Sequence, residues 1–272
     1  MIRLKKMTTM MTTSCECGGA PRGEVVRFLA DYASWLTGCG ATCIRLEKNV
    51  ARMARAFGCE SRVTVMTGSV QVILRDSAGA CCGEASADVA RTPISYNINT
   101  LLSRLSWEVA DGKVSFDDAR KLFRRIIRPR PRCRWALLLL VAAANASFCR
   151  LFGGDAVAMA VVAVATLAGF GLKEVMTGYG VDARITVFCC AFVSSVLGAT
   201  DMLFSIGTTP AVALGTSILY LVPGIPFLNS FSDMICRHYV CALGRFMDAV
   251  ILTCCLSAGL CAGMALMDAG MF

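Results

Sequence analysis

The chain has a single histidine, His238, among its 272 residues. It has sixteen cysteines, but they form no paired C-x-x-C sets, and one histidine cannot supply the usual Cys/His zinc spacing. Several cysteines stand in apolar runs, where cysteine behaves as a small hydrophobe: Cys189, Cys190, Cys254, Cys255 and Cys261. The close pair in "CEC" at 15–17 lies in a Thr/Gly-rich leader. We therefore predict no metal site, no disulfide framework and no cofactor.

Two further features are missing. The first residues, "MIRLKKMTTMMTTS", contain no continuous apolar stretch, so they are not a secretory signal. The sequence has no G-x-S-x-G motif, and its one histidine stands in the apolar half, away from a nucleophile-base pair. We predict no catalytic residue, and therefore a protein that is not an enzyme.

Apolar residues are abundant and charge is unevenly distributed. Hydrophobic residues make up 56% of the chain, and the mean hydropathy is +0.61, which is rare in a soluble domain of this length. Up to Arg134 there are 22 basic and 12 acidic residues, whereas from Trp135 onward there are 5 and 7. The sequence therefore predicts a basic, water-soluble first half and a second half embedded in a bilayer.

The first half is predicted to be an α+β domain. Residues 1–22 are expected to form a flexible leader, and the domain itself covers 23–128. Apolar residues recur at helical spacing from Glu24 to Leu36 and again up to Gly58. "SRVTVMTGSVQVIL" then alternates around Gly68 as in two short strands, with another strand after Cys81. Two more helices follow, the second starting at Ser115. We expect this domain, with free thiols, in the reducing cytoplasm.

Arginine is concentrated before the apolar half. "RRIIRPRPRCR" at 124–134 contains six arginines, and its last part, 129–134, is predicted to be an Arg/Pro linker. Such a cluster can bind nucleic acid, but it directly precedes an apolar segment. The positive-inside rule places arginine at the cytoplasmic end of a first membrane helix. We therefore expect membrane lipids, and not nucleic acid, as its partner.

Residues 135–272 are predicted to be an α-helical multi-pass domain, given that about 20 residues cross a bilayer. We expect about five transmembrane helices: 135–152, 156–172, 185–200, 202–222 and 240–267. With a cytoplasmic N-terminal domain, the C-terminus is then extracytoplasmic. Lys173, Arg184, Arg237 and Arg245 fall on the cytoplasmic side and only Arg150 outside, as the positive-inside rule expects. A four-span alternative merges the third and fourth spans around "TDMLFSIGTTP".

A break interrupts the apolar half at "LVPGIPFLNSFSDM", residues 221–234. Pro223 and Pro226 each lack an amide donor, and Gly224 lies between them. Transporters place substrate or ion sites at such breaks. Asn229 and Asp233 stand four residues apart, on one face if a helix resumes after Pro226. The alternative is an ordinary cytoplasmic turn, in which Asp233 and Arg237 are solvated.

Other polar residues of the apolar half are weaker candidates. Arg245 stands three residues before Asp248 on the last span, as a functional site or as a structural pair at a helix end. Asp201 is expected in a periplasmic loop. Asn145 is expected to form a hydrogen bond between helices. Small residues throughout the spans allow close helix packing, which suits a bundle around a path better than a simple anchor.

"LVPGIPFLNSFSDMICRHYVCALGRFMDA" resembles the signature of the ThrE/YjjP family of threonine/serine exporter-like proteins, with its P-G-x-P segment, a following Asp and a later Arg. The first half is similar to the same family in "GCGATCIRLEKNVARMARAFG", "VTVMTGSVQVIL" and "NINTLLSRLSWEVADGKVSFDDARKLFRRI". The resemblance covers roughly residues 24–267. Cysteine at many span positions and "ICRHY" after Asp233 depart from the family pattern, which bears mainly on the substrate.

The resemblance implies a secondary exporter of small amino acids or small carboxylates, driven by an ion gradient. It also implies the larger subunit of a split pair, with a separate small multi-span partner and an oligomeric assembly. Carried over to this chain, the substrate or ion path consists of Pro223, Gly224, Pro226, Asn229, Asp233, Arg245 and Asp248. As a mechanism, Arg245 would pair with a substrate carboxylate, and Asp233 would accept a proton or hold an ammonium group.

The family's Arg-x-Glu matches Arg45 and Glu47 in the soluble domain, where an exposed helix pair explains them equally well. A second hypothesis comes from another class: a membrane-anchored regulatory or binding protein that acts through its basic cytoplasmic domain. An anchor needs only one or two spans and no break inside the membrane. The number of small-residue spans around the Pro-Gly-x-Pro segment therefore favours the exporter.

Overall fold

The computed structural model describes residues 16–17, 20–90, 92–128, 133–204 and 207–267. The chain divides into two compact units: the first contains Met1–Pro129 and Ile225–Phe246, and the second contains Arg130–Gly224 and Met247–Phe272. The predicted leader, 1–22, and the Arg/Pro linker, 129–134, lie mostly outside the described residues, as does Cys15 of "CEC". The contacts thus add 225–246, which the sequence assigned to the membrane-spanning part, to the N-terminal unit.

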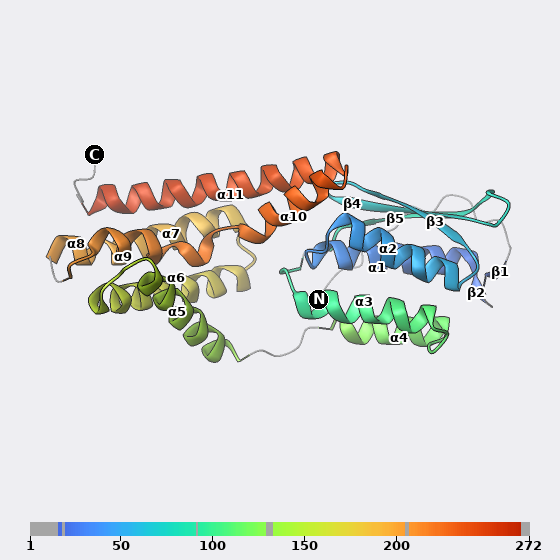
Figure 1. Cartoon of the computed structure of the whole chain (residues 1–272), viewed down its shortest axis with the longest axis horizontal. Helices are drawn as coiled ribbons and strands as arrows, with labels where there is room; N and C mark the ends of the chain where they lie inside the picture. Colours follow the sequence, from blue (N-terminus) through green and yellow to red (C-terminus); the bar gives the residue numbers. More distant parts are fainter. Residues whose placement is uncertain (1–15, 18–19, 91, 129–132, 205–206, 268–272) are drawn as a thin grey trace. The chain divides into compact units, whose positions relative to one another are not determined.

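The first unit has the predicted order of helix, helix, short sheet, helix and helix (Figure 1). Two-residue strands β1 (Glu16–Cys17) and β2 (Ala20–Pro21) precede it. Its elements are α1 (Arg22–Gly38), α2 (Cys43–Ala56), β3 (Glu60–Val65), β4 (Ser69–Arg75), β5 (Cys81–Asp88), α3 (Tyr96–Ala110) and α4 (Phe116–Ile126). Ser115 is the N-cap of α4 and accepts a hydrogen bond from the Asp118 amide at 3.3 Å, as the sequence predicts.

Helices α1 and α2 form a layer between the three-stranded sheet and the α3–α4 pair (Figure 1). The periodic face of α1 that the sequence indicates is the buried one. Phe28 packs edge-to-face against Phe116 and Phe123 of α4, with ring centroids 5.7 Å apart in both pairs. The Tyr32 hydroxyl donates to the Leu102 carbonyl of α3 at 2.9 Å, which satisfies this polar group inside the core.

The sheet is antiparallel with β4 in the centre, in the order β3-β4-β5. Val70, Val72 and Leu74 on β4 are fully buried and point to one face, whereas the residues between them are partly exposed. This is the period-two alternation of a strand with one face on the core. It confirms the two strands predicted around Gly68.

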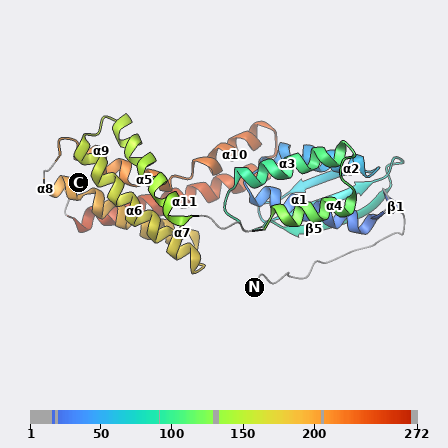
Figure 2. The same ribbon diagram turned by 90° about the horizontal axis from the view of Figure 1, so that it is seen from below.

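The second unit is helical. Its elements are α5 (Arg134–Leu151), α6 (Ala156–Gly178), α7 (Ala183–Gly198), α8 (Thr200–Phe204), α9 (Pro210–Ser217) and the 3₁₀ turn η1 (Leu219–Leu221). Helix α10 (Gly224–Ile235) begins at the boundary between the units, and α11 (Tyr239–Leu266) starts in the first unit and ends in the second. Within the second unit, α6 packs against α5, α7 and α9 (Figure 2).

Within the described residues, four helices are long and apolar enough to cross a membrane: Arg134–Leu151, Ala156–Gly178, Ala183–Phe204 and Tyr239–Leu266. A bent pair, Pro210–Leu221 with Gly224–Ile235, brings the number to five if it counts as one broken span. The prediction of about five helices agrees with this range, and four of the five predicted spans coincide with these helices to within a few residues.

The predicted fourth span, 202–222, is wrong in its bounds. Its first residues belong to α8, at the end of the third candidate span, and the next helix begins only at Pro210. The polar pair Thr208–Thr209 after Gly207 separates the two helices. Pro210 opens α9, because a proline in the first turn has no amide bond to lose. The apolar run therefore continues through the break at Val222–Pro223 into α10.

Candidate functional site

The sequence places its candidate site at the break, and the helix there is interrupted at Val222–Pro223. The interruption is shorter than predicted, because α10 begins already at Gly224. Pro226 lies in the first turn of α10, where amide groups have no intrahelical acceptor. Helix α9 has already ended at Ser217 and passed into the 3₁₀ turn η1, Pro223 stands in the two-residue gap that follows, and Pro226 is compatible with the restart as α10.

Asp233 on α10 is fully buried, with 0% of its surface exposed. One carboxylate oxygen accepts a hydrogen bond from the backbone amide of Cys43, the first residue of α2, at 2.8 Å. The other accepts from Arg245 Nη1 on α11 at 2.7 Å. The carboxylate thus lies at a helix N-terminus and against a guanidinium, both of which stabilise its charge. The alternative in which Asp233 is a solvated turn residue is therefore wrong.

Arg245 and Asn229 contact the same turn between α1 and α2. The second guanidinium nitrogen of Arg245, Nη2, donates to the Ala41 carbonyl at 2.9 Å. The Asn229 side-chain amide donates to the Gly40 carbonyl at 2.9 Å. Gly40 has φ +86°, a conformation that glycine adopts without steric cost. Three residues that the sequence named as candidates, Asn229, Asp233 and Arg245, therefore converge on this turn and on the first residue of α2.

A tight turn brings α11 back beside α10. The His238 amide donates to the Asp233 carbonyl at 2.9 Å and the Arg237 amide to the Met234 carbonyl at 3.0 Å, with Arg237 at φ +64°. This is the Schellman pattern, with arginine in the position that glycine usually takes. Arg237 is exposed, as the turn interpretation expects. The Ser230 hydroxyl donates to the Ala242 carbonyl at 2.8 Å and fixes the two helices against one another.

The remaining predicted residues are placed elsewhere. Arg45 donates to Asn99 Oδ1 of α3 at 3.2 Å, and Glu47 lies 3.6 Å from His238 Nε2. Asp248 is exposed and forms no ion pair with any residue of the described ranges. The structural pair of Arg245 with Asp248 is not formed, because Arg245 is directed to Asp233. Gly224 has open space around its Cα.

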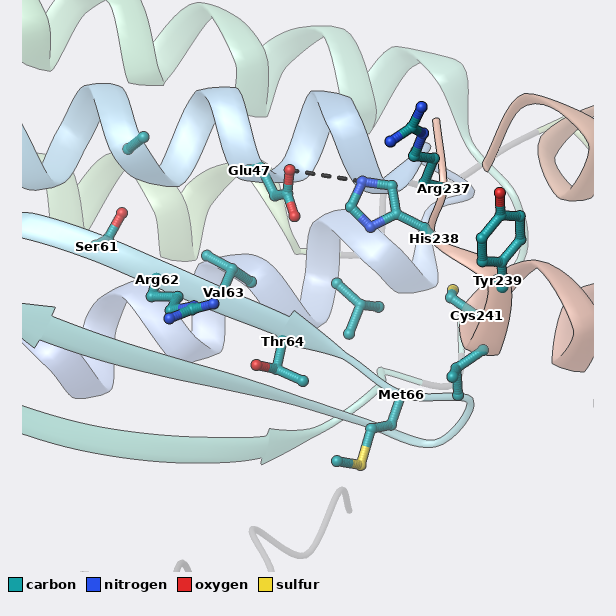
Figure 3. A pocket seen from close by; sticks show the side chains of 13 residues that line it. Glu47, Ser61, Arg62, Val63, Thr64, Met66, Arg237, His238, Tyr239 and Cys241 are labelled. Carbon is teal, nitrogen blue, oxygen red and sulfur yellow. Dashed lines mark ion pairs between the residues drawn. The ribbon is translucent and has the colours of Figure 1, made fainter. Parts of the chain in front are cut away.

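A pocket of about 550 Å³ lies beside this cluster, between α2, β3 and the turn into α11 (Figure 3). In Figure 3, Glu47 on α2 points to His238, and Arg62 and Thr64 project from β3. Cys241 also lines the pocket. Charged groups of both signs therefore surround an accessible space next to the buried Asp233–Arg245 pair.

Two buried thiols lie next to Asp233. The Sγ atoms of Cys43 and Cys241 and a carboxylate oxygen of Asp233 are all within 4.8 Å of one another. Both cysteines are free. The hydrogen bond that Cys43 shares with Cys241, together with its burial, raises the pKa of the Cys43 thiol above its ordinary value. The sequence did not single out these cysteines, because they are far apart along the chain and follow no local motif.

The second unit contains a buried polar network among its apolar helices. Asn145 on α5 donates to Thr166 Oγ1 of α6 at 2.7 Å and to the Thr216 carbonyl of α9 at 3.0 Å. The prediction that Asn145 forms hydrogen bonds between helices is confirmed. Ser194 and Tyr220 share a hydrogen bond of 2.9 Å nearby in the fold of this unit. Buried polar groups among apolar helices need such partners, and they mark candidate paths for polar solutes.

Asp201 is not in a loop, contrary to the prediction. It lies in α8 and is fully buried. One oxygen accepts from the Gly207 amide at 2.7 Å, whereas Oδ2 has no hydrogen-bond partner among the residues that the structure describes. The Asp155 carboxylate is close: a Cβ added at Gly207 would lie 2.8 Å from Asp201 Oδ2 and 3.1 Å from Asp155 Oδ2.

The family model and the individual relatives that match this chain indicate the same family. The family model described as "Putative threonine/serine exporter" matches residues 27–267. A "Probable succinate transporter subunit YjjP" of Klebsiella aerogenes is 26% identical over 243 residues, which is 89% of this chain and 93% of the relative. The protein of the same name from Escherichia coli K12 is 23% identical, over 86% of this chain and 91% of its own length.

A third relative, a "Probable threonine/serine exporter" of Mycobacterium tuberculosis, is 22% identical over 81% of this chain, which corresponds to 41% of the relative. No solved structure matches the chain significantly. The names of these relatives describe transporters or exporters and not enzymes.

Proposed function

This chain belongs to the threonine/serine exporter family, and on this premise we propose that it is one subunit of a secondary exporter of small amino acids, threonine- or serine-like, or of small carboxylates. Family membership and the apolar helices together support a membrane protein. We place it in the inner membrane of the cell as a multi-pass protein, and we propose that an ion gradient drives export.

The buried Asp233–Arg245 pair is the observation that carries this proposal. Its N–O distance is 2.7 Å, and Asp233 has no exposed surface. An amino acid zwitterion contains one carboxylate and one ammonium group. The carboxylate can replace Asp233 on Arg245 while the ammonium binds Asp233, so that neither charge is left buried and unpaired. Such an exchange opens the contact between α10 and α11 without a net change of charge.

The Asp233–Arg245 pair should interact differently with the two substrate classes, amino acids and dicarboxylates. A dicarboxylate brings two negative charges and no cation, so Asp233 would repel it unless Asp233 is protonated. Export of a dicarboxylate would therefore require proton uptake at Asp233, whereas a zwitterion does not. We propose amino acids as the first substrates to test, with succinate as the comparison.

The other predicted path residues keep their place in the proposal. Pro223 and Gly224 stand at a helix break, the kind of place where transporters bind solutes, and Pro226 lies in the first turn of the following helix. Asn229 carries a polar side chain on the same helix as Asp233. Asp248 follows Arg245 by three residues on α11, where its exposed carboxylate could accept the solute or the coupling ion.

A partner subunit is supported by the names of two relatives, which describe a transporter subunit. We propose a separate small multi-span protein as that partner, in an oligomer surrounded by lipid. We place the N-terminal domain in the cytoplasm and the C-terminus outside. A reporter fused after Phe272 should then be active only on the extracytoplasmic face, and cytoplasmic activity would overturn the five-span topology.

Efflux from cells preloaded with labelled threonine or serine tests the function when the chain is produced together with its partner. We expect Asp233→Asn to abolish efflux while the amount of protein in the membrane stays normal. Arg245→Lys should also reduce efflux, because lysine lacks the bidentate fork. Glu108→Gln is the matched control, since Glu108 forms an exposed pair with Arg104. Normal efflux in a well-inserted Asp233→Asn variant would remove Asp233 from the path.

The second candidate function is a membrane-anchored regulatory or binding protein that acts through its basic N-terminal domain. The pocket beside His238, with Glu47 and Arg62 among its lining residues, favours it. This function predicts that Arg62→Ala weakens ligand binding to the purified protein. It also predicts that Asp233→Asn leaves solute efflux unchanged, which separates it from the exporter.

A further inference from the structure

We propose that Cys43, Cys241 and Asp233 form a binding site for one thiophilic divalent cation of the Zn²⁺ class. The three side chains come from α2, α11 and α10, and all three are buried. Their ligand atoms lie within 4.8 Å of one another. The site shares Asp233 with the proposed export path, but it is argued only from the donor atoms and their surroundings, and metal binding to the purified chain tests it without any transport measurement.

The spacing suits a shared ion after a small contraction. Zn²⁺ binds thiolate sulfur at about 2.3 Å and carboxylate oxygen at about 2.0–2.2 Å. Two sulfurs on one tetrahedral ion are then about 3.8 Å apart. The upper limit of 4.8 Å in this cluster leaves at most about 1 Å for the side chains to move. Rotation of a cysteine side chain covers such a distance without a change in the helices.

The charges also balance. Two thiolates, one carboxylate and a divalent cation sum to minus one, and the Arg245 guanidinium beside Asp233 returns the buried cluster to neutrality. Without the metal, two neutral thiols with the Asp233–Arg245 pair are neutral as well. Neutrality in both states avoids an uncompensated charge in the interior. Binding must therefore release two protons, one from each thiol.

The surroundings orient the donors and leave a way in. The Cys43 amide and Arg245 both hold the Asp233 carboxylate, as outer partners do around metal ligands. Cys43 is the first residue of α2, so its position is fixed by the start of that helix. Cys241 lines the pocket of about 550 Å³, which gives an ion and a fourth, water ligand access to the cluster.

Metal titration of the full chain in detergent micelles, purified under reducing conditions, tests the site. Co²⁺ is the spectroscopic probe and Zn²⁺ the competitor. We expect a tetrahedral Co²⁺ spectrum with a sulfur-to-metal charge-transfer band, displacement by Zn²⁺, and release of two protons per bound ion. Cys43→Ser with Cys241→Ser should lose one equivalent of bound metal. Cys149→Ser with Cys190→Ser, which also removes two buried thiols, should lose none.

A second measurement needs no variant and remains decisive if the serine double variant does not fold. In the chain without substitutions, Zn²⁺ should protect Cys43 and Cys241 together from alkylation by maleimide, and mass spectrometry measures the alkylation of each cysteine. Equal alkylation with and without Zn²⁺, or unchanged metal stoichiometry in the folded cluster variant, overturns the proposal. It is also overturned if the two cysteines are recovered as a disulfide that forms with peroxide and bind no ion when reduced.

Discussion

The two units bury different kinds of side chain. The largest fully buried side chains of the described residues belong to the first unit, among them Tyr32, Leu29 and Met53. In the second unit, the fully buried positions are occupied by small or polar residues such as Ala165, Ser194 and others of their size. Many of its large apolar side chains are exposed instead: Trp135, Leu139, Leu140, Phe148, Leu151, Val164, Val175 and Ile185.

This difference is what we expect if water surrounds the first unit and lipid surrounds the second. In water, the free energy of folding comes largely from the burial of large apolar side chains, as in the first unit. In lipid, an outward leucine loses nothing, and helices associate through close packing of small residues and through hydrogen bonds. Among the described residues, each unit also buries one aspartate, and of these two Asp233 of the first unit is the one with an ion pair. The predictions below test these contrasts from the largest expected effect to the smallest.

Removal of the cation beside Asp233 should have the largest effect. We expect Arg245→Ala to lower the free energy of unfolding by about 3–5 kcal/mol, because it leaves a buried carboxylate without a compensating positive charge. Chemical denaturation in a mild detergent measures the change. The double variant Arg245→Ala with Asp233→Ala should regain part of the loss. An equal or larger loss in the double variant would contradict the assignment of the cost to an unpaired charge.

Truncation of one leucine in each unit should separate the two solvents. Leu29 is fully buried on α1, and Leu140 on α5 is 68% exposed. We expect Leu29→Ala to cost about 2–5 kcal/mol of unfolding free energy. Leu140→Ala should cost less than about 0.5 kcal/mol, as for other outward positions. The same denaturation curves serve both variants, and equal costs would show that Leu140 is enclosed by protein.

Among the buried groups tested, the polar network of the second unit should give the smallest effect. Asn145→Ala removes two hydrogen bonds between helices, and we expect a cost of about 0.6–1.7 kcal/mol, which spans the average and the maximum for such bonds in a membrane bundle. Ser147→Ala on the same helix is the control, since Ser147 is exposed and bonds only within α5, to Ala143. A cost of Asn145→Ala no larger than that of the control would mean that these bonds are replaced in the variant.

Local chemistry explains why much of the fold could be predicted from the sequence. The α1 pattern of Val25, Phe28 and Leu29, the alternation of β4 and the Ser115 cap each depend on neighbouring residues. The apolar runs likewise indicated four of the spans. The fourth span was misplaced because apolar residues continue on both sides of Gly207 to Pro210. Hydropathy alone does not distinguish one long span from two pieces joined by a polar corner.

The candidate site could be predicted only in part. Proline and glycine at the break, and charges inside apolar segments, identify Asp233 and Arg245 as unusual. Their partners at Gly40, Ala41 and Cys43 could not be inferred. These residues contribute backbone groups, and nearly every residue type has the same backbone amide and carbonyl. The proximity of Cys43 and Cys241 could not be inferred either, because it depends on the fold and not on their spacing in the sequence.

The bond from the Cys43 amide to Asp233 has a consequence for biosynthesis. The ribosome completes residue 43 long before residue 233, so the start of α2 has no carboxylate partner while the intervening helices are being made. The N-terminal domain can assemble its sheet and core early, since domains fold as they emerge. The α1–α2 turn, however, cannot form its contacts with α10 until Asp233 has been made. A ribosome stalled before Asp233 should therefore hold a domain whose interior is protected and whose α1–α2 turn still exchanges its amide protons.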